Sequence, residues 1–300
     1  MIAHVAHAAA GCSAGELAAY RARSFFSGPL VAAVTLNVVV TALQIGAYAG
    51  RIAGVRTGRI GTSISLFNFF TLASRLANLV VTPALGSLAD GAASYATCTG
   101  TIPGRFEWQL RAIIGAGTIG AVVGTLLLPT FIMLFMRGVY AFERRGSMLQ
   151  AALRLFDPRV LLDIVRSVRV PPFREIASFR PTSLPAKLLV GNAVVTGVYA
   201  VGVVASFYAS VIDLGARTTA TGLSGLVNGF GTVCFSFFVD PTTAYITDQA
   251  VKGERSPEDV RTMVFWLAVT AILGWILSQA ILIPGAYFIA AGANVFHPHP

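Results

Sequence analysis

Six long apolar runs limit what this chain can fold into. Each approaches the roughly 20 residues that a helix needs to cross a bilayer. The runs are residues 28–50, 64–90, 112–136, 186–212, 222–248 and 262–290. None alternates like a barrel strand, and only helices and closed barrels satisfy every backbone polar group in lipid. The chain is therefore predicted to be an all-α integral membrane protein with six transmembrane helices.

The composition agrees with this prediction. Of the 300 residues, 55% are hydrophobic and only 12% are charged, whereas about 25% of the residues in a soluble domain are charged. A basic patch for nucleic acid needs a water-exposed face, and little of this chain is polar. We therefore expect no nucleic-acid partner and interpret the net charge of +9 as a signal of topology.

The distribution of lysine and arginine predicts the orientation. The loops after the first, third and fifth runs hold 16 basic residues, whereas the termini and the other loops hold 5. Cytoplasmic loops carry the excess of basic residues, so those three loops are predicted to be cytoplasmic and both termini to lie outside. Cys12 and Cys98 would then share the outer face, where a disulfide between them is one option.

This topology divides the chain into five segments. They are an external lead-in (1–27), a first three-helix repeat (28–136), a basic cytoplasmic loop (137–185), a second three-helix repeat (186–290) and an external tail (291–300). In the basic loop, apolar residues at helical spacing oppose arginines, as in a helix lying on a membrane surface. Those apolar residues are Leu161, Leu162, Val165 and Val168. The arginines either attract anionic lipid head groups or mark the cytoplasmic side only.

The two three-helix units resemble each other weakly. Asn37-Val-Val-Val-Thr41 is similar to Asn192-Ala-Val-Val-Thr196, and a Val-x-Pro-x6-Asp-x-Ala pattern occurs in both halves. Because an odd number of helices separates the two copies, the repeat would be inverted, as in many secondary transporters. Chance similarity between segments rich in alanine, glycine and valine is the alternative.

Prolines recur in both units. Pro83 and Pro241 occupy matching places in the second and fifth helices, and Pro129 and Pro284 come late in the third and sixth. Proline removes a backbone donor and clashes with the preceding turn, so Pro83 and Pro241 are each predicted to kink or break their helix. Freed backbone groups persist in a membrane only beside protein or a wet cavity. The second and fifth helices are therefore predicted to line an interior.

Polar residues of the second helix recur at spacings of three and four, which places them on one face. They are Asn68, Thr71, Arg75, Asn78 and Thr82. Arg75 lies roughly 16 Å from the cytoplasmic start of its helix, where an unpaired arginine costs a few kcal/mol. Arg75 either bridges to Asp240 of the fifth helix or meets an anionic group in a water-filled cavity. Both hold if a substrate competes with Asp240 for Arg75.

Three arginines, Arg51, Arg56 and Arg59, precede the second helix at the predicted cytoplasmic mouth. Guanidinium groups bind phosphate oxygens bidentately, so this cluster suits a diphosphate, although the positive-inside rule alone also accounts for it. The sequence contains no nucleophile–base pair, nucleotide-binding glycine motif or zinc-ligand spacing that we can identify. We therefore expect a transporter rather than an enzyme, with no cofactor and no metal.

Several motifs resemble the Amj family of lipid II flippases. They are RIAGVRTGRI, SLFN and SRLAN in the first half, and GNAVVTGVY, ARTTATGLSGLVNG and FVDPTTAYITDQAVKGE in the second. The resemblance implies a protein of the bacterial cytoplasmic membrane that moves an undecaprenyl-diphosphate-linked cell-wall precursor from the inner to the outer leaflet.

The residues within these motifs become the candidate site. The candidates for substrate binding are Arg51, Arg56, Arg59, Asn68, Arg75, Asn78 and Asn228, and those for an ion pair or ion coupling are Asp240 and Asp248. Anionic membrane lipids are expected partners of the basic loop. The alternatives are an ion-coupled transporter of another anionic solute or lipid, and a membrane-embedded enzyme acting on polyprenyl phosphates.

Overall fold

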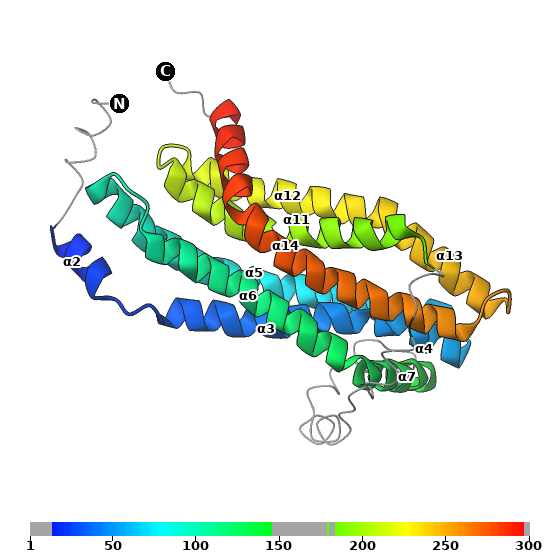
Figure 1. Ribbon diagram of the computed structural model, residues 1–300. Helices are drawn as coiled ribbons and strands as arrows, with labels where there is room; N and C mark the ends of the chain where they lie inside the picture. The colour runs from blue at the N-terminus through cyan, green and yellow to red at the C-terminus, as the bar shows by residue number, and fades with distance from the viewer. Residues whose placement is uncertain (1–13, 146–178, 180–183, 297–300) are drawn as a thin grey trace.

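A computed structural model of the protein describes residues 14–145, 179 and 184–296, which form a bundle of helices (Figure 1). Six helical segments are long and apolar enough to cross a membrane, and they correspond one to one with the six predicted runs. The helices are α2 (Ala14–Ala22), α3 (Gly28–Ala47), α4 (Ala49–Thr57), α5 (Ile60–Thr99), α6 (Gly104–Leu126), α7 (Leu128–Arg145), α11 (Ala186–Ile212), α12 (Arg217–Phe238), α13 (Asp240–Val251) and α14 (Pro257–Phe296). The six-helix prediction is thus confirmed.

Two of the spans are interrupted. The first span breaks at Tyr48, between α3 and α4, and the fifth breaks at Val239, between α12 and α13. Pro241 occupies the first turn of α13, a position at which the missing N–H of proline costs nothing. The break predicted at Pro241 is therefore confirmed. By contrast, α5 continues through Pro83 without interruption.

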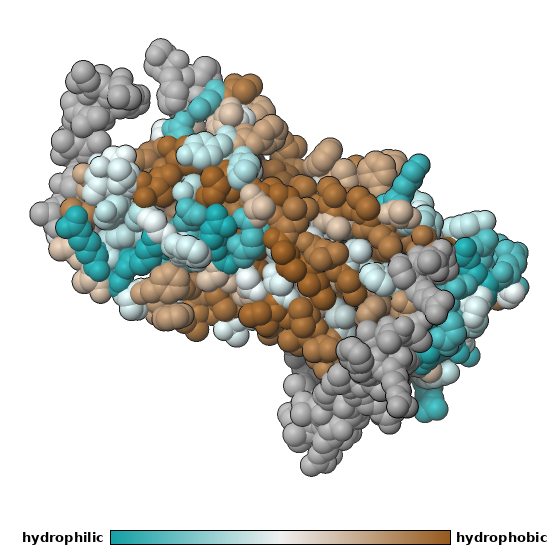
Figure 2. All heavy atoms as spheres, viewed as in Figure 1, coloured by the Kyte–Doolittle hydropathy of each residue, from teal (hydrophilic) through white to brown (hydrophobic). Residues whose placement is uncertain are grey.

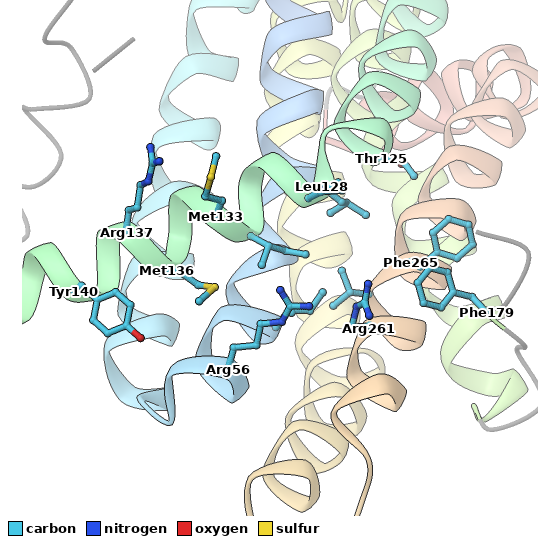
Figure 3. A pocket seen from close by; sticks show the side chains of 14 residues that line it. Arg56, Thr125, Leu128, Met133, Met136, Arg137, Tyr140, Phe179, Arg261 and Phe265 are labelled. Carbon is cyan, nitrogen blue, oxygen red and sulfur yellow. The ribbon is translucent and has the colours of Figure 1, made fainter. Parts of the chain in front are cut away.

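The third span differs from its predicted bounds of 112–136. It runs over Gly104–Leu126, and Pro129 lies instead in the first turn of the separate helix α7. Proline is tolerated in a first turn but breaks a helix interior, so the apolar run is divided just before it. Helix α7 runs across the ends of the spanning helices (Figure 3).

Close packing holds α7 in this position. A Cβ added at Gly46 would lie 2.6 Å from the ring of Phe131, and one added at Gly50 would lie 3.1 Å from the ring of Phe135. The absence of side chains at these two glycines lets α7 approach the first span closely. The amphipathic helix predicted around residues 161–168 lies outside the described residues.

Equivalent contacts occur in the two halves of the bundle. Helix α3 packs against α5 and α6, and α11 packs against α12 and α14. Asn37 Nδ2 donates to the Ile113 carbonyl at 2.7 Å, and Asn192 Nδ2 donates to the Leu267 carbonyl at 2.9 Å. Asn192 follows Asn37 by 155 positions, and Leu267 follows Ile113 by 154. The resemblance between Asn37–Thr41 and Asn192–Thr196 thus extends to what these segments contact.

The connections collect at the two ends of the bundle. Figure 1 shows α2 and the α5–α6 connection at one end, and α4, α7 and α13 at the other, while α3 and α11 run in opposite directions. Figure 2 shows hydrophobic residues across the middle of one face and hydrophilic residues toward its ends. Cys98, at the α2 end, is disulfide-bonded, whereas Cys234 is free; Cys12 lies outside the described residues.

Candidate functional site

Helices α5 and α12 are the most peripheral of the spans. In their most apolar windows only 18% and 11% of residues are buried, compared with 44% to 50% in the other four spans. Each packs against α11 and leaves large apolar side chains exposed, such as Leu79 on α5 and Phe230 on α12. Their other faces line cavities. The prediction that these two helices line an interior holds for one face of each.

Three adjoining cavities follow α5 along the bundle, and we name them by one residue each. The Arg51 cavity, between α4, α5 and α13, has a volume of about 360 Å³. It shares Phe67 with the Thr71 cavity of about 130 Å³, which shares Tyr199 with the Asn228 cavity of about 40 Å³. Together they form a row of cavities between the two halves of the protein.

The Arg51 cavity contains an ion pair between the two halves. Arg51 Nη2 lies 2.8 Å from Asp240 Oδ1, with the Arg51 side chain 13% exposed and that of Asp240 40% exposed. The two helix breaks create this pair. Asp240 begins α13, where the helix dipole favours a negative charge, and Arg51 lies in the first turn of α4 after the break at Tyr48.

Arg51 retains binding capacity beyond this pair. Its guanidinium lies 5.5 Å from the centre of the Phe67 ring, and its Nε is buried without a hydrogen-bond partner among the described residues. A buried donor without a partner carries a desolvation penalty. An anion that entered the cavity would relieve this penalty.

Tyr48, which the sequence reasoning missed, connects the first break to the second half. Its hydroxyl donates to Asn192 Oδ1 at 3.4 Å, and Asn192 Nδ2 donates to Thr270 Oγ1 at 2.9 Å as well as to Leu267. A tyrosine within an otherwise apolar run was the available signal, because a buried hydroxyl requires a partner. The contact joins the α3–α4 junction to α11 and α14.

The predicted cluster of three arginines is not one site. Only Arg51 lines the Arg51 cavity; Arg56 lies in a separate pocket, and Arg59 pairs with Glu143 of α7. Arg56 follows Arg51 by five positions in α4, and this spacing places the two side chains on roughly opposite sides of the helix. Gly58, at φ 68°, then ends α4, and Arg59 lies in the short connection to α5.

Most of the other candidates lie along the row of cavities. Asn68 and Asp248 line the Arg51 cavity, and Asn78 and Asn228 line the Asn228 cavity. The Oδ1 of Asn228 is buried without a described hydrogen-bond partner. Asp248 Oδ2 lies 2.7 Å from Lys252 Nζ, and this hydrogen bond raises the pKa of the Lys252 ammonium group. The polar face predicted for α5 therefore faces the cavities at several points.

Arg75 lies on α5 between Thr71 and Asn78. Its side chain is outside the described part of the structure, so its contact with Asp240 or with an anion stays a prediction. The ion pair that the structure gives Asp240 is with Arg51. At the α2 end of the bundle, Asp90 of α5 pairs with Arg217 of α12. Ion pairs between the halves thus lie toward both ends of the bundle.

Comparison with known proteins identifies the family. The sequence model of the family described as "Amj: Alternate to MurJ" matches residues 36–293. The chain is 32% identical over 254 residues to the protein named "Lipid II flippase Amj" from Bacillus subtilis (strain 168), an alignment that covers 84% of this chain and 92% of the relative. No solved structure matches the chain. The protein therefore belongs to the Amj family.

Proposed function

We propose that this protein is a lipid II flippase, a multi-pass protein of the bacterial cytoplasmic membrane that moves the lipid-linked cell-wall precursor to the outer leaflet. The relative named "Lipid II flippase Amj" supports this function. The row of cavities between the two halves is the observation that carries it. A flippase needs a polar route for a charged head group across about 30 Å of hydrocarbon, while the lipid tail remains in the bilayer.

The end of the bundle with α4, α7 and α13 is the cytoplasmic end in this proposal. Most of the basic residues fall in the loops assigned to this side, as the positive-inside rule requires. The disulfide at Cys98 supports placing the opposite end outside, because disulfides persist in oxidising compartments. Both termini then lie outside the cytoplasm.

The two halves form an inverted repeat in this proposal. The equivalent bonds from Asn37 and Asn192, and the opposite directions of α3 and α11 (Figure 1), support it. Inverted repeats place substrate at their interface and expose it alternately by rocking of one repeat against the other. That interface is where the row of cavities lies.

The diphosphate of lipid II first meets Arg51. Its negative charge competes with Asp240 for the guanidinium and accepts a hydrogen bond from the unpartnered Nε. Asn68, Thr71, Arg75, Asn78 and Asn228 then provide polar groups along the path. The path begins at Arg51 rather than at Arg56 and Arg59, which are directed to other parts of the protein. The undecaprenyl tail follows in the lipid beside the exposed apolar faces of α5 and α12.

Two ion pairs act as gates in this mechanism. Arg51–Asp240 connects the halves toward the cytoplasmic end, and Asp90–Arg217 connects them toward the outer end. The described conformation has both pairs formed, as an occluded state requires. Opening the first admits the head group, and opening the second releases it.

The membrane potential favours outward movement of the anion, by about 2.3 kcal/mol per charge per 100 mV. Asp240 and Asp248 are the candidates for ion coupling. The alternatives, transport of another anionic solute or lipid and a membrane enzyme acting on polyprenyl phosphates, predict different products. A released head group would indicate the enzyme.

Genetic replacement tests the function. Cells depleted of their known lipid II flippase should survive when this protein is expressed at normal level in the membrane. Failure of the wild-type protein to restore growth, with its presence in the membrane verified, would exclude lipid II flipping as its function.

A further inference from the structure

A second basic cavity lies across α4 from the Arg51 cavity. We call it the Arg56 pocket; it has a volume of about 410 Å³ and lies between α4, α7 and α14 (Figure 3). This volume is within the range of roughly 300–1,000 Å³ that is typical of small-molecule sites. Arg56, Arg137 and Arg261 line it, and none of the described lining residues is acidic.

Two of these arginines converge. Figure 3 shows the side chains of Arg56 and Arg261 directed toward one another, while Arg137 projects from α7 away from this pair. Their charges repel each other. Arg261 also pairs with Glu258 at 2.9 Å, whereas Arg56 has no ion pair with a described residue. Arg56 is exposed and Arg261 is half-buried. An anion between two cations held close together offsets their repulsion, and guanidinium groups bind phosphate oxygens in pairs.

The remaining walls are apolar. They include Ile132, Met133 and Met136 from α7, and Val264 and Phe265 from α14. Methionine side chains adapt their shape to a variable apolar partner. Because α7 runs across the ends of the spanning helices (Figure 3), the pocket lies where lipid head groups meet acyl chains in the proposed topology.

From these observations we propose that the Arg56 pocket binds the phosphate of an anionic membrane phospholipid between Arg56 and Arg261. The first acyl carbons lie against Met133 and Met136. The lipid is a bound partner and not the transported substrate, because α4 separates the pocket from the row of cavities. The proposal rests on the proposed cytoplasmic end but does not require that the protein moves lipid II.

Lipid binding is measured on the purified full-length protein by native mass spectrometry, with phosphatidylglycerol and phosphatidylcholine as probes. Phosphatidylglycerol should bind more tightly. Arg56→Ala and Arg261→Ala should each weaken its binding about tenfold, the loss expected for one charge-assisted contact. Lys187→Ala, which removes an exposed charge at the same end of the bundle, should leave binding unchanged.

Met133→Trp provides a test that keeps all the charges. The larger side chain should exclude the lipid by filling the pocket, and the melting temperature of each variant verifies folding. Equal binding of the two phospholipids, or unchanged binding by Arg56→Ala and Arg261→Ala, would overturn the proposal. If inorganic phosphate bound as tightly as phosphatidylglycerol, the apolar walls of the Arg56 pocket would contribute nothing to binding, and the proposal of a lipid ligand would be overturned. If undecaprenyl diphosphate displaced an equal concentration of phosphatidylglycerol, the pocket would bind the transported substrate, and the proposal that its lipid is only a bound partner would be overturned.

Discussion

Removal of Asp240 should destabilise the protein more than removal of Arg51. Asp240→Ala leaves the Arg51 charge unpaired at 13% exposure, whereas Arg51→Ala leaves a carboxylate that is 40% exposed. An uncompensated buried charge costs about 3 kcal/mol or more, so we expect about 3 kcal/mol for Asp240→Ala. The exposed carboxylate costs about 1 kcal/mol, and loss of the Phe67 contact adds about 1 kcal/mol, which gives about 2 kcal/mol for Arg51→Ala.

The double variant Arg51→Ala/Asp240→Ala separates pairing from other effects. It leaves neither charge unpaired, so its cost should fall short of the sum of the single costs by about 1–3 kcal/mol. Denaturant titration of the purified protein in mixed micelles measures these free energies of unfolding. Single costs that add without coupling, or a larger cost for Arg51→Ala than for Asp240→Ala, would refute the reasoning.

Charge reversal then separates structure from transport. Arg51→Asp/Asp240→Arg restores an ion pair and should recover part of the stability. It should not recover lipid II transport, because the cation now lies on α13 and an anion on α4. Transport at the wild-type rate in the reversed pair would show that the pair only holds the halves together. The same assay on Lys187→Ala controls for loss of a positive charge at that end of the bundle.

Three further predictions concern packing, gating and the substrate path. A Cβ at Gly274 would lie 2.6 Å from the Ala193 carbonyl, so Gly274→Ala should cost about 1–3 kcal/mol in the same titration; Gly225→Ala, with open space around it, should change stability little. Cysteines replacing Asp90 and Arg217 and joined by a thiol-reactive cross-linker that spans the length of the lost arginine side chain should stop transport, and free transport in the cross-linked variant would exclude a gate there. Arg75→Ala should abolish growth rescue at normal protein level, and full rescue would remove Arg75 from the path.

Hydropathy was sufficient to predict the six spans, because a helix that crosses a bilayer needs a run of fixed length. It misplaced the third span, since Glu107 and Arg111 read as loop residues. In the structure Arg111 Nε lies 2.8 Å from Glu107 Oε1 one turn away, and this mutual neutralisation lets both residues lie inside α6. The spacing of Glu107 and Arg111, four residues apart, was the signal for the true start of this span. Its end was misplaced because Pro129 was interpreted as part of the span and not as the start of a new helix.

The sequence predicted which residues line the candidate site better than it predicted which of them form ion pairs. Helical spacing was sufficient to place Asn68, Thr71 and Asn78 on one face of α5, and all three line the row of cavities. The partner of Asp240 was not predictable from depth, because the break at Tyr48 places Arg51 beside it. The sequence around Tyr48 contains no proline that would predict this break.

Photo-cross-linking of lipid II tests the central claim, that its head group passes through the cavities between α5 and α12. A photoreactive amino acid replaces Thr71, which lines the middle cavity, or Leu79, which is 65% exposed on the outer side of the same helix. Lipid II that carries a label on its head group is present in the reconstituted membrane during illumination. The account predicts that the labelled head group attaches at position 71 and not at position 79. Attachment at position 79 with none at position 71 would contradict it.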